Sequence, residues 1–246
     1  MLRVLVIQND PTAPLGLVGE WLRAEGVELN MISAYAGDSV PDAVPADVDG
    51  IVALGGDMGA LSDHEAPWLA AERDLLRDAV DREVPVLGLC LGGQLLAVAT
   101  GGRVGRAAIG EAGVVDMTPA DDLVSDGVFG SLAGQVVRAV QWHVDAVDEL
   151  PPGATLLLSN DACPIQAFRV GSFAWGVQFH PEVDAGIVEG WVADDGPLAT
   201  AGVSAADAVD QVRSAYADLV ATWAPVIAGW VDVVRQQAES EAPSPR

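Results

Sequence analysis

Apolar runs and helical repeats alternate along the first part of the chain. Residues 2–7 form a run rich in β-branched residues that stops before an Asn-Asp-Pro sequence, as expected of a buried parallel strand. Residues 15–25 have apolar positions at helical spacing, and shorter apolar runs at 27–32 and 50–54 indicate two more strands. The pattern therefore begins as strand, helix, strand, strand.

The same alternation continues to residue 100. Residues 66–82 carry an amphipathic helical pattern, residues 86–89 are a short apolar run, and residues 91–100 return to helical character. Strands and helices of these lengths predict an α/β domain with a doubly wound, mostly parallel mixed sheet flanked by helices.

The middle of the chain has a different pattern. Residues 104–159 are rich in glycine and in short strand-like runs, which predicts a small antiparallel extension. Residues 166–170 and 172–179 flank a Val-Gly-Ser turn and predict a hairpin whose second strand leads directly to His180.

The last part of the chain predicts a helical segment. Over residues 205–237 apolar side chains recur every three or four positions, so one face is expected to pack on the domain, with a kink or break at Pro225. Residues 238–246 are polar and proline-bearing and are expected to form a disordered tail. We therefore expect one domain over residues 1–237.

Composition narrows the possible partners. The 246 residues are 50% hydrophobic, enough for one substantial core, and their formal net charge is −24. The twelve basic residues are all arginine, which excludes a Schiff-base or phosphate-loop lysine. So much negative charge disfavours nucleic acid and anionic membrane surfaces as partners. A buried first strand in place of a signal peptide, and only two cysteines, favour the cytoplasm.

The strongest chemical signal is the Gly-Leu-Cys-Leu-Gly sequence at 88–92, between a predicted strand and a predicted helix. A Gly-X-Cys-X-Gly turn at this position is typical of a nucleophile elbow, with a thiol in place of a hydroxyl. It places Cys90 at a helix N-terminus, where free N–H groups and the helix dipole favour the thiolate. The backbone N–H of Leu91 then points toward an oxyanion on the substrate.

A second signal completes the set of groups. His180 ends a predicted strand and can face the same sheet edge as Cys90, and Glu182 follows two residues later. A thiol, an imidazole and a carboxylate are a nucleophile, its base and the group that orients the base. We expect these three side chains to meet.

These segments carry a family resemblance. The sequences at 88–94 and 176–182 resemble, in order and separation, the two signature segments of class I, triad-type glutamine amidotransferases. Those at 55–59, 142–145 and 162–168 resemble the stand-alone branch related to the amidotransferase domain of GMP synthase. The resemblance covers about residues 1–183 and implies a flavodoxin-like fold.

The resemblance implies roles for the motif residues. Cys90 would attack the side-chain amide of glutamine to form a γ-glutamyl thioester, His180 would act as acid and base, and Glu182 would orient His180. The N–H groups of Gly56 and Leu91 would form the oxyanion hole.

The resemblance also implies substrate contacts at Gln94, Trp142, His143 and Asp145, with Asp145 as partner of the α-amino group. One position departs from the family: Asp57 follows the Gly-Gly pair where proline is usual. Its carboxylate would repel the carboxylate of the substrate, or bind an amine on another γ-glutamyl compound.

No metal or cofactor is expected. Cys163 lies in a predicted loop without a histidine nearby in sequence, which indicates a structural role. Acidic residues flank His64, but no second histidine has suitable spacing for a closed metal site.

Three functions are compatible with these residues. The first is a glutamine amidotransferase that releases ammonia, for which a separate synthetase subunit would be the acceptor. The second is a stand-alone γ-glutamyl peptidase or hydrolase acting on γ-glutamyl peptides or amines. The third is a non-catalytic binding or regulatory protein, which a buried or filled pocket would favour. We expect the first, and the sequence leaves the oligomeric state open.

Overall fold

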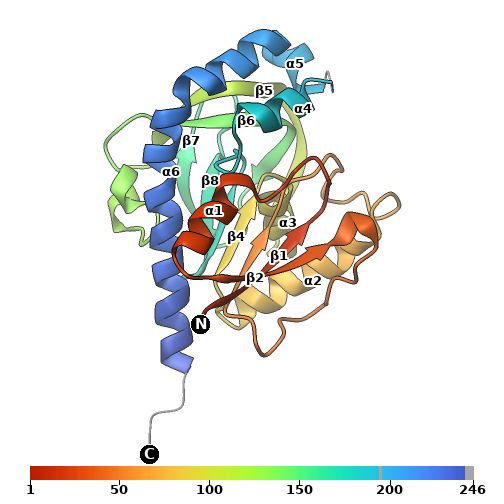
Figure 1. Ribbon diagram of the computed structural model, residues 1–246, viewed down its shortest axis with the longest axis vertical. Helices are drawn as coiled ribbons and strands as arrows, with labels where there is room; N and C mark the ends of the chain where they lie inside the picture. The colour runs from red at the N-terminus through yellow and green to blue at the C-terminus, as the bar shows by residue number, and fades with distance from the viewer. Residues whose placement is uncertain (194–195, 242–246) are drawn as a thin grey trace, which may run out of the picture.

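One mixed sheet runs through the computed structural model, which describes residues 1–193 and 196–241 (Figure 1). Its strands are β1 (Arg3–Gln8), β2 (Glu28–Ser33), β3 (Gly50–Ala53), β4 (Val86–Leu89), β5 (Arg103–Pro119), β6 (Val137–Glu149), β7 (Thr155–Ser159), β8 (Ala167–Val170) and β9 (Ala174–Val177). The helices are α1 (Gly16–Ala24), α2 (Trp68–Asp81), α3 (Leu91–Ala99), α4 (Ala185–Trp191), α5 (Gly196–Ala201) and α6 (Ala205–Glu241), with 3-10 turns η1 (Ala34–Ala36), η2 (Leu123–Ser125) and η3 (Gly130–Leu132).

The strand order is β2-β1-β3-β4-β9-β8-β7-β5-β6. Strands β2, β1, β3, β4 and β9 pair in parallel, whereas β9 pairs antiparallel with β8, and every later pair is antiparallel. This arrangement confirms the predicted α/β fold, including its antiparallel extension.

The alternation of side chains along β1 divides the core into two layers. Val4 and Val6 face the layer that α1 and α6 cover, and Leu5 and Ile7 face the layer covered by α2 and α3. Both faces of the inner parallel strands β1, β3, β4 and β9 are therefore buried, which explains why these strands are mostly apolar, whereas the edge strand β2 is partly exposed and carries polar residues.

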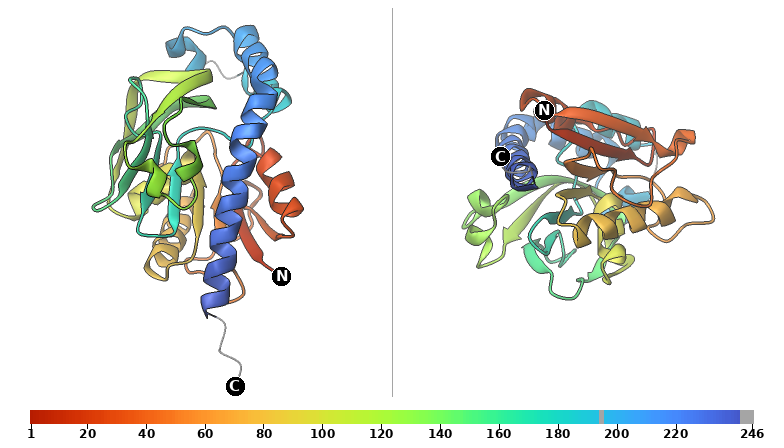
Figure 2. Two further views of the ribbon diagram at one scale, coloured as in Figure 1. Left: turned by 90° about the vertical axis from the view of Figure 1, so that its left-hand side faces the viewer. Right: turned by 90° about the horizontal axis from the view of Figure 1, so that it is seen from below.

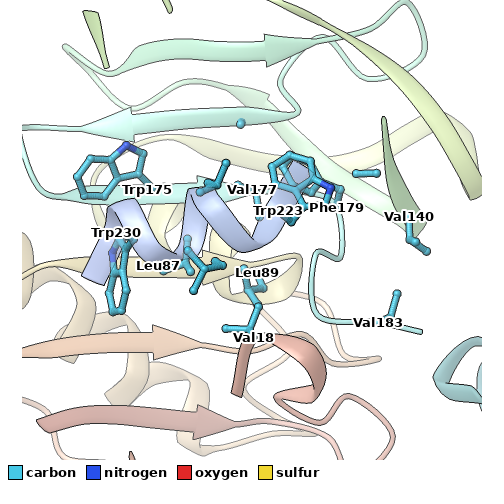
Figure 3. Close-up of a cluster of buried hydrophobic side chains, with 14 of the residues drawn as sticks. Val18, Leu87, Leu89, Val140, Trp175, Val177, Phe179, Val183, Trp223 and Trp230 are labelled. Atoms are coloured by element: carbon cyan, nitrogen blue, oxygen red, sulfur yellow. The ribbon is translucent and has the colours of Figure 1, made fainter. Parts of the chain in front are cut away.

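Helix α6 extends along the length of the domain (Figure 2). Trp223 and Trp230 are buried in the same cluster as Trp175 and Val177 of β9 (Figure 3). Helix α6 is long enough to span a membrane, and an 18-residue window within it has a mean hydropathy of 1.4, but its tryptophans lie in the core of the domain. Because each large apolar side chain contributes roughly 1.5–3 kcal/mol when fully buried, this face binds α6 firmly to the sheet.

The structure corrects three expectations. Residues 104–159 contain two long strands, β5 and β6, besides the short β7, because bulges and glycines interrupt the apolar pattern without ending the ladder. Pro225 does not split the helix, since α6 continues on both sides of it. The expected tail is helical as far as Glu241, and residues 242–246 lie outside the described residues.

Candidate active site

Cys90 occupies a sharp turn between β4 and α3, as the elbow motif predicts. Its backbone has φ 49° and ψ −107°, a conformation that residues with a side chain rarely adopt. Gly88 and Gly92 lie in direct backbone contact, and a Cβ atom on Gly92 would also overlap the carbonyl of Ala53. Only glycine fits these two positions. The Gly-X-Cys-X-Gly motif therefore reflects the close packing of α3 on the strands beneath it.

His180 follows β9 and faces the same edge of the sheet. Its backbone N–H donates to the carbonyl oxygen of Val140 at 2.8 Å, which ties it to β6. Its ring nitrogen Nδ1 lies 2.7 Å from Oε1 of Glu182, and its imidazole packs edge-to-face with the Trp191 ring at a centroid distance of 4.8 Å. The imidazole is therefore held from two sides.

The remaining nitrogen of His180 is available for chemistry. Nε2 is buried and makes no hydrogen bond with the described residues. Burial alone would lower the pKa of His180, but the negative charge of Glu182 and the nearby Cys90 outweigh burial and raise this pKa well above its ordinary value. The arrangement thus favours a histidine that holds a proton next to the thiol.

Glu182 is positioned by the first helix. The backbone N–H of Leu17 donates to the carbonyl oxygen of Glu182 at 2.8 Å, and Gly16 leaves room for this close approach. The side chain of Glu182 is only 1% exposed. Three chain segments therefore converge at Cys90, His180 and Glu182.

An open pocket of about 590 Å³ reaches both Cys90 and His180. Glu182 contacts the far nitrogen of His180 and does not line the pocket, and Leu91 does not line it either. The other predicted site residues all line the pocket: Cys90, His180, Gly56, Asp57, Gln94, Trp142, His143 and Asp145.

The predicted oxyanion loop borders the thiol. A Cβ atom built on Gly55 would lie 3.7 Å from Cβ of Cys90, and one on Gly56 would lie 3.0 Å from the Leu91 side chain. Among the described residues, neither the N–H of Gly56 nor that of Leu91 has a hydrogen-bond partner. Asp57 is exposed at the pocket lining.

A buried acid supports this loop from behind. Glu72 of α2 is fully buried, and its Oε1 accepts from Nδ2 of Asn9 at 3.3 Å, while Oε2 has no partner among the described residues. Asn9 also donates to the carbonyl oxygen of Leu54 and accepts from Nε1 of Trp68. Burial raises the pKa of Glu72 to about 8.

The predicted substrate contacts form one wall of the pocket. Nε2 of Gln94 donates to the carbonyl oxygen of Asp145 at 3.0 Å and to Oε1 of Gln178 at 3.2 Å. Both amide hydrogens of Gln94 are thus used within the protein, which leaves its oxygen for a substrate. Nδ1 of His143 lies 3.1 Å from the same carbonyl oxygen, and Trp142 packs near Trp191 at a centroid distance of 6.0 Å.

A second buried group of cysteine, histidine and glutamate lies behind this wall. The ligand atoms of Glu111, His143 and Cys163 lie within 4.8 Å of one another. Glu111 accepts from Asn160 and Gln166 and contacts Nε2 of His143 at 3.1 Å, and the thiol of Cys163 donates to a backbone carbonyl. Although burial opposes it, these donors lower the pKa of Glu111, whereas burial raises the pKa of Cys163 to about 12. The group is a saturated hydrogen-bonded cluster.

Four residues of the site, Gln178, Glu111, Glu72 and Trp191, have no predicted role. A signal existed for Gln178, because it precedes His180 by two positions, and in an extended chain this places both side chains on one face. Glu111 follows a bulge in β5, Glu72 reads as a solvent-facing residue of α2, and Trp191 belongs to a helix that the pattern did not predict. None of these three carries a local signal.

Comparisons with known proteins agree with this geometry. The family model of glutamine amidotransferase class-I matches residues 19–190. A glutamine-hydrolysing GMP synthase subunit of Natronomonas pharaonis is 36% identical over 185 residues, which cover 74% of this chain and 89% of the relative. Gamma-glutamyl peptidase 5 of Arabidopsis thaliana is 31% identical over 166 residues, covering 67% of this chain and 65% of the relative. The solved glutamine amido transferase of Methylobacillus flagellatus has a TM-score of 0.83 at 28% identity and covers 94% of this chain and 95% of its own.

Proposed function

The chain belongs to the class-I glutamine amidotransferase family, and from this premise we propose that it hydrolyses the γ-amide of glutamine with Cys90, His180 and Glu182. The observation that carries the proposal is the convergence of these three side chains at one open pocket, with the thiol and the imidazole lining it. An open pocket also argues against the non-catalytic alternative, which predicts a filled one.

The proposed reaction has two stages. Cys90 gives its proton to His180 and attacks the amide carbon; His180 passes the proton to the leaving nitrogen, and ammonia departs to leave a γ-glutamyl thioester. His180 then takes a proton from water, the resulting hydroxide attacks the thioester, and glutamate and the thiol are released. Glu182 holds the imidazole and stabilises its protonated form in both stages.

The oxyanion of each stage would lie between the free N–H groups of Gly56 and Leu91. Losing one such donor typically costs about 3 kcal/mol of transition-state stabilisation. Asp57, in place of proline, leaves the backbone beside Gly56 with more freedom, so we expect a less rigid oxyanion hole than in relatives that have proline there.

The amino-acid end of the substrate would bind the wall that the predicted substrate contacts form. Asp145 is the proposed partner of the α-ammonium group, and the free oxygen of Gln94 is a second acceptor for it. Trp142 and His143 would complete this end of the pocket.

A specific observation favours the second candidate, a γ-glutamyl hydrolase for larger substrates. Pockets of roughly 300–1,000 Å³ enclose drug-sized ligands, so glutamine would fill only part of the 590 Å³ present here. Asp10, Asp57 and Asp145 line the pocket, and none of its described lining residues is an arginine. A γ-glutamyl compound with an amine on its leaving group would suit such a pocket.

The partner and the location follow from the same proposal. As an amidotransferase, the protein would pass ammonia to a separate synthetase subunit; as a γ-glutamyl hydrolase, it would need none. We propose a cytoplasmic location for both, with no nucleic acid or membrane partner, in line with the net charge of −24.

The test is covalent labelling with 6-diazo-5-oxonorleucine, followed by mass spectrometry. We expect the label on Cys90 in the wild type and in a Cys163→Ser control, and no label in Cys90→Ser. An unlabelled Cys90, under conditions that label a known amidotransferase, would refute the proposal. Comparing hydrolysis of glutamine with that of neutral and cationic γ-glutamyl amines then separates the two candidates.

A further inference from the structure

A chain of hydrogen bonds connects the pocket wall to the sulfur of Cys90. Nε2 of Gln94 lies between the carbonyl oxygen of Asp145, at 3.0 Å, and Oε1 of Gln178, at 3.2 Å. Nε2 of Gln178 then lies 3.4 Å from Sγ of Cys90. The side chains of Gln94 and Gln178 are both buried.

The chemistry of the first acceptor fixes the direction of every link. A backbone carbonyl can only accept, so the amide of Gln94 must turn its nitrogen toward Asp145. The second hydrogen of that nitrogen meets Gln178, which must therefore present its oxygen to Gln94. The nitrogen of Gln178 is then left on the other side, directed at the sulfur. The opposite orientation of either amide would break two hydrogen bonds.

The carbonyl oxygen of Asp145, where this series of hydrogen bonds starts, is itself held in place. The carbonyl oxygen of Asp145 also faces Nδ1 of His143, whose Nε2 contacts the carboxylate of Glu111. Both His143 and Glu111 are buried, and Glu111 accepts further hydrogen bonds from Asn160 and Gln166. The saturated cluster thus anchors the strand segment that sets the polarity of the two amides.

We propose that Gln178 is a catalytic residue that donates an N–H hydrogen bond to the thiolate of Cys90, and that Gln94 is a positioning residue that keeps this N–H directed at the sulfur. The proposal rests on the proposed role of Cys90 as nucleophile. A hydrogen bond to a charged sulfur stabilises the thiolate relative to the thiol, and burial strengthens it. It would act alongside the helix N-terminus and His180.

A purely structural role for Gln178 makes a different prediction. If the amide only filled a buried position, its loss would lower the stability of the fold and leave the ionisation of the thiol unchanged. Alkylation by iodoacetamide, in which the thiolate displaces iodide, measures that ionisation without any assumption about the substrate. The rate is followed against pH, and the labelled peptide is identified by mass spectrometry.

The decisive variant is Gln178→Met, which keeps the length and loses the donor. Because a hydrogen bond to a charged group contributes roughly 1.5–3 kcal/mol, the midpoint of the pH profile should move up by about one to two pH units. Gln141→Met is the matched control: it removes a fully buried amide that bonds Gln166 and does not touch Cys90. Its profile should match the wild type.

A second variant keeps the proposal testable if Gln178→Met fails to fold. Gln94→Met leaves Gln178 in place and removes the partner that orients it, together with the hydrogen bond to the carbonyl oxygen of Asp145, so the midpoint should move in the same direction by a smaller amount. Profiles of Gln178→Met and Gln94→Met that coincide with the wild type would overturn the proposal. A wild-type Cys90 that iodoacetamide does not label would instead refute its role as nucleophile, which separates the two failures.

Discussion

Replacing Glu72 by glutamine should make the protein more stable in neutral and alkaline solution. Glu72 lies behind the loop that carries Gly56, fully buried, with one hydrogen bond from Asn9 at 3.3 Å and no ion pair with an arginine among the described residues. Glutamine has nearly the same shape, and its oxygen can accept the same hydrogen bond. The substitution therefore removes a titrating proton with little change in packing.

The magnitude follows from the raised pKa. The carboxyl group of Glu72 has an ordinary pKa of 4.5, and burial raises the folded value to about 8. Between these pH values the folded protein holds a proton that the unfolded chain has released, so the stability of the wild type falls as pH rises through this window. A difference of 3.5 units, at about 1.4 kcal/mol per unit, gives a loss of up to about 5 kcal/mol above pH 8. Glu72→Gln carries no such loss.

Urea denaturation of both proteins at several pH values between 4.5 and 8 tests this window. The free energy of unfolding of Glu72→Gln, minus that of the wild type, should rise steadily with pH. Glu20→Gln, on the exposed side of α1, is the control for a change of one charge in a strongly acidic protein. If the difference between Glu72→Gln and the wild type stays constant across the window, Glu72 does not titrate as burial requires and the reasoning is wrong.

Three further predictions concern the triad and the helices. Glu182→Gln removes the charge that raises the pKa of His180, so kcat should fall by a factor on the order of 10³ with little change in KM, as steady-state kinetics would show; an unchanged kcat would exclude Glu182 from the triad. Gly92→Ala should lower the free energy of unfolding by about 3 kcal/mol because its Cβ would overlap the backbone of β3. Gly229→Ala in α6, where the added Cβ would make only ordinary van der Waals contacts, should raise it by about 0.5–1 kcal/mol. Equal effects of the two substitutions on urea unfolding would contradict this steric argument. Pro225→Ala restores an N–H in the interior of α6 and should increase the free energy of unfolding by about 2 kcal/mol, which a higher midpoint of thermal unfolding would show. A lower midpoint would mean that the helix needs the proline.

The sequence predicts the parts of the site that lie at strand ends. In a parallel sheet the carboxyl ends of β4 and β9 share one edge, so two motifs about 90 residues apart could be expected to meet there. The three elements from 66 to 100 were predictable for a related reason, because each has a single uninterrupted hydrophobic pattern. The confirmed fold rests on these elements.

The remainder depends on contacts that no local pattern encodes. Glu111 and Cys163 meet His143 only because β5, β6 and the loop before β8 fold together, and β5 has register shifts that interrupt its pattern. Trp191 reaches His180 from a short helix whose position depends on tertiary packing. Glu72 looks like any other acid of an amphipathic helix, although it is fully buried and bonded to Asn9, which also donates to the carbonyl oxygen of Leu54.

The chain contains two sets of cysteine, histidine and glutamate, and residue type alone cannot tell which one is reactive. In the cluster of Cys163, His143 and Glu111, every polar atom already has a partner, the thiol donates to a carbonyl, and burial raises its pKa to about 12. Cys90 instead lies on a strained turn at a helix N-terminus, beside a pocket and a histidine whose Nε2 has no hydrogen-bond partner among the described residues. A group whose hydrogen bonds are all satisfied is stable and unreactive, whereas one that keeps an unpaired donor or acceptor beside a cavity can transfer a proton to a bound molecule. The cluster of Cys163, His143 and Glu111 can therefore serve as a rigid support for the pocket wall, while Cys90 and His180 carry out the chemistry.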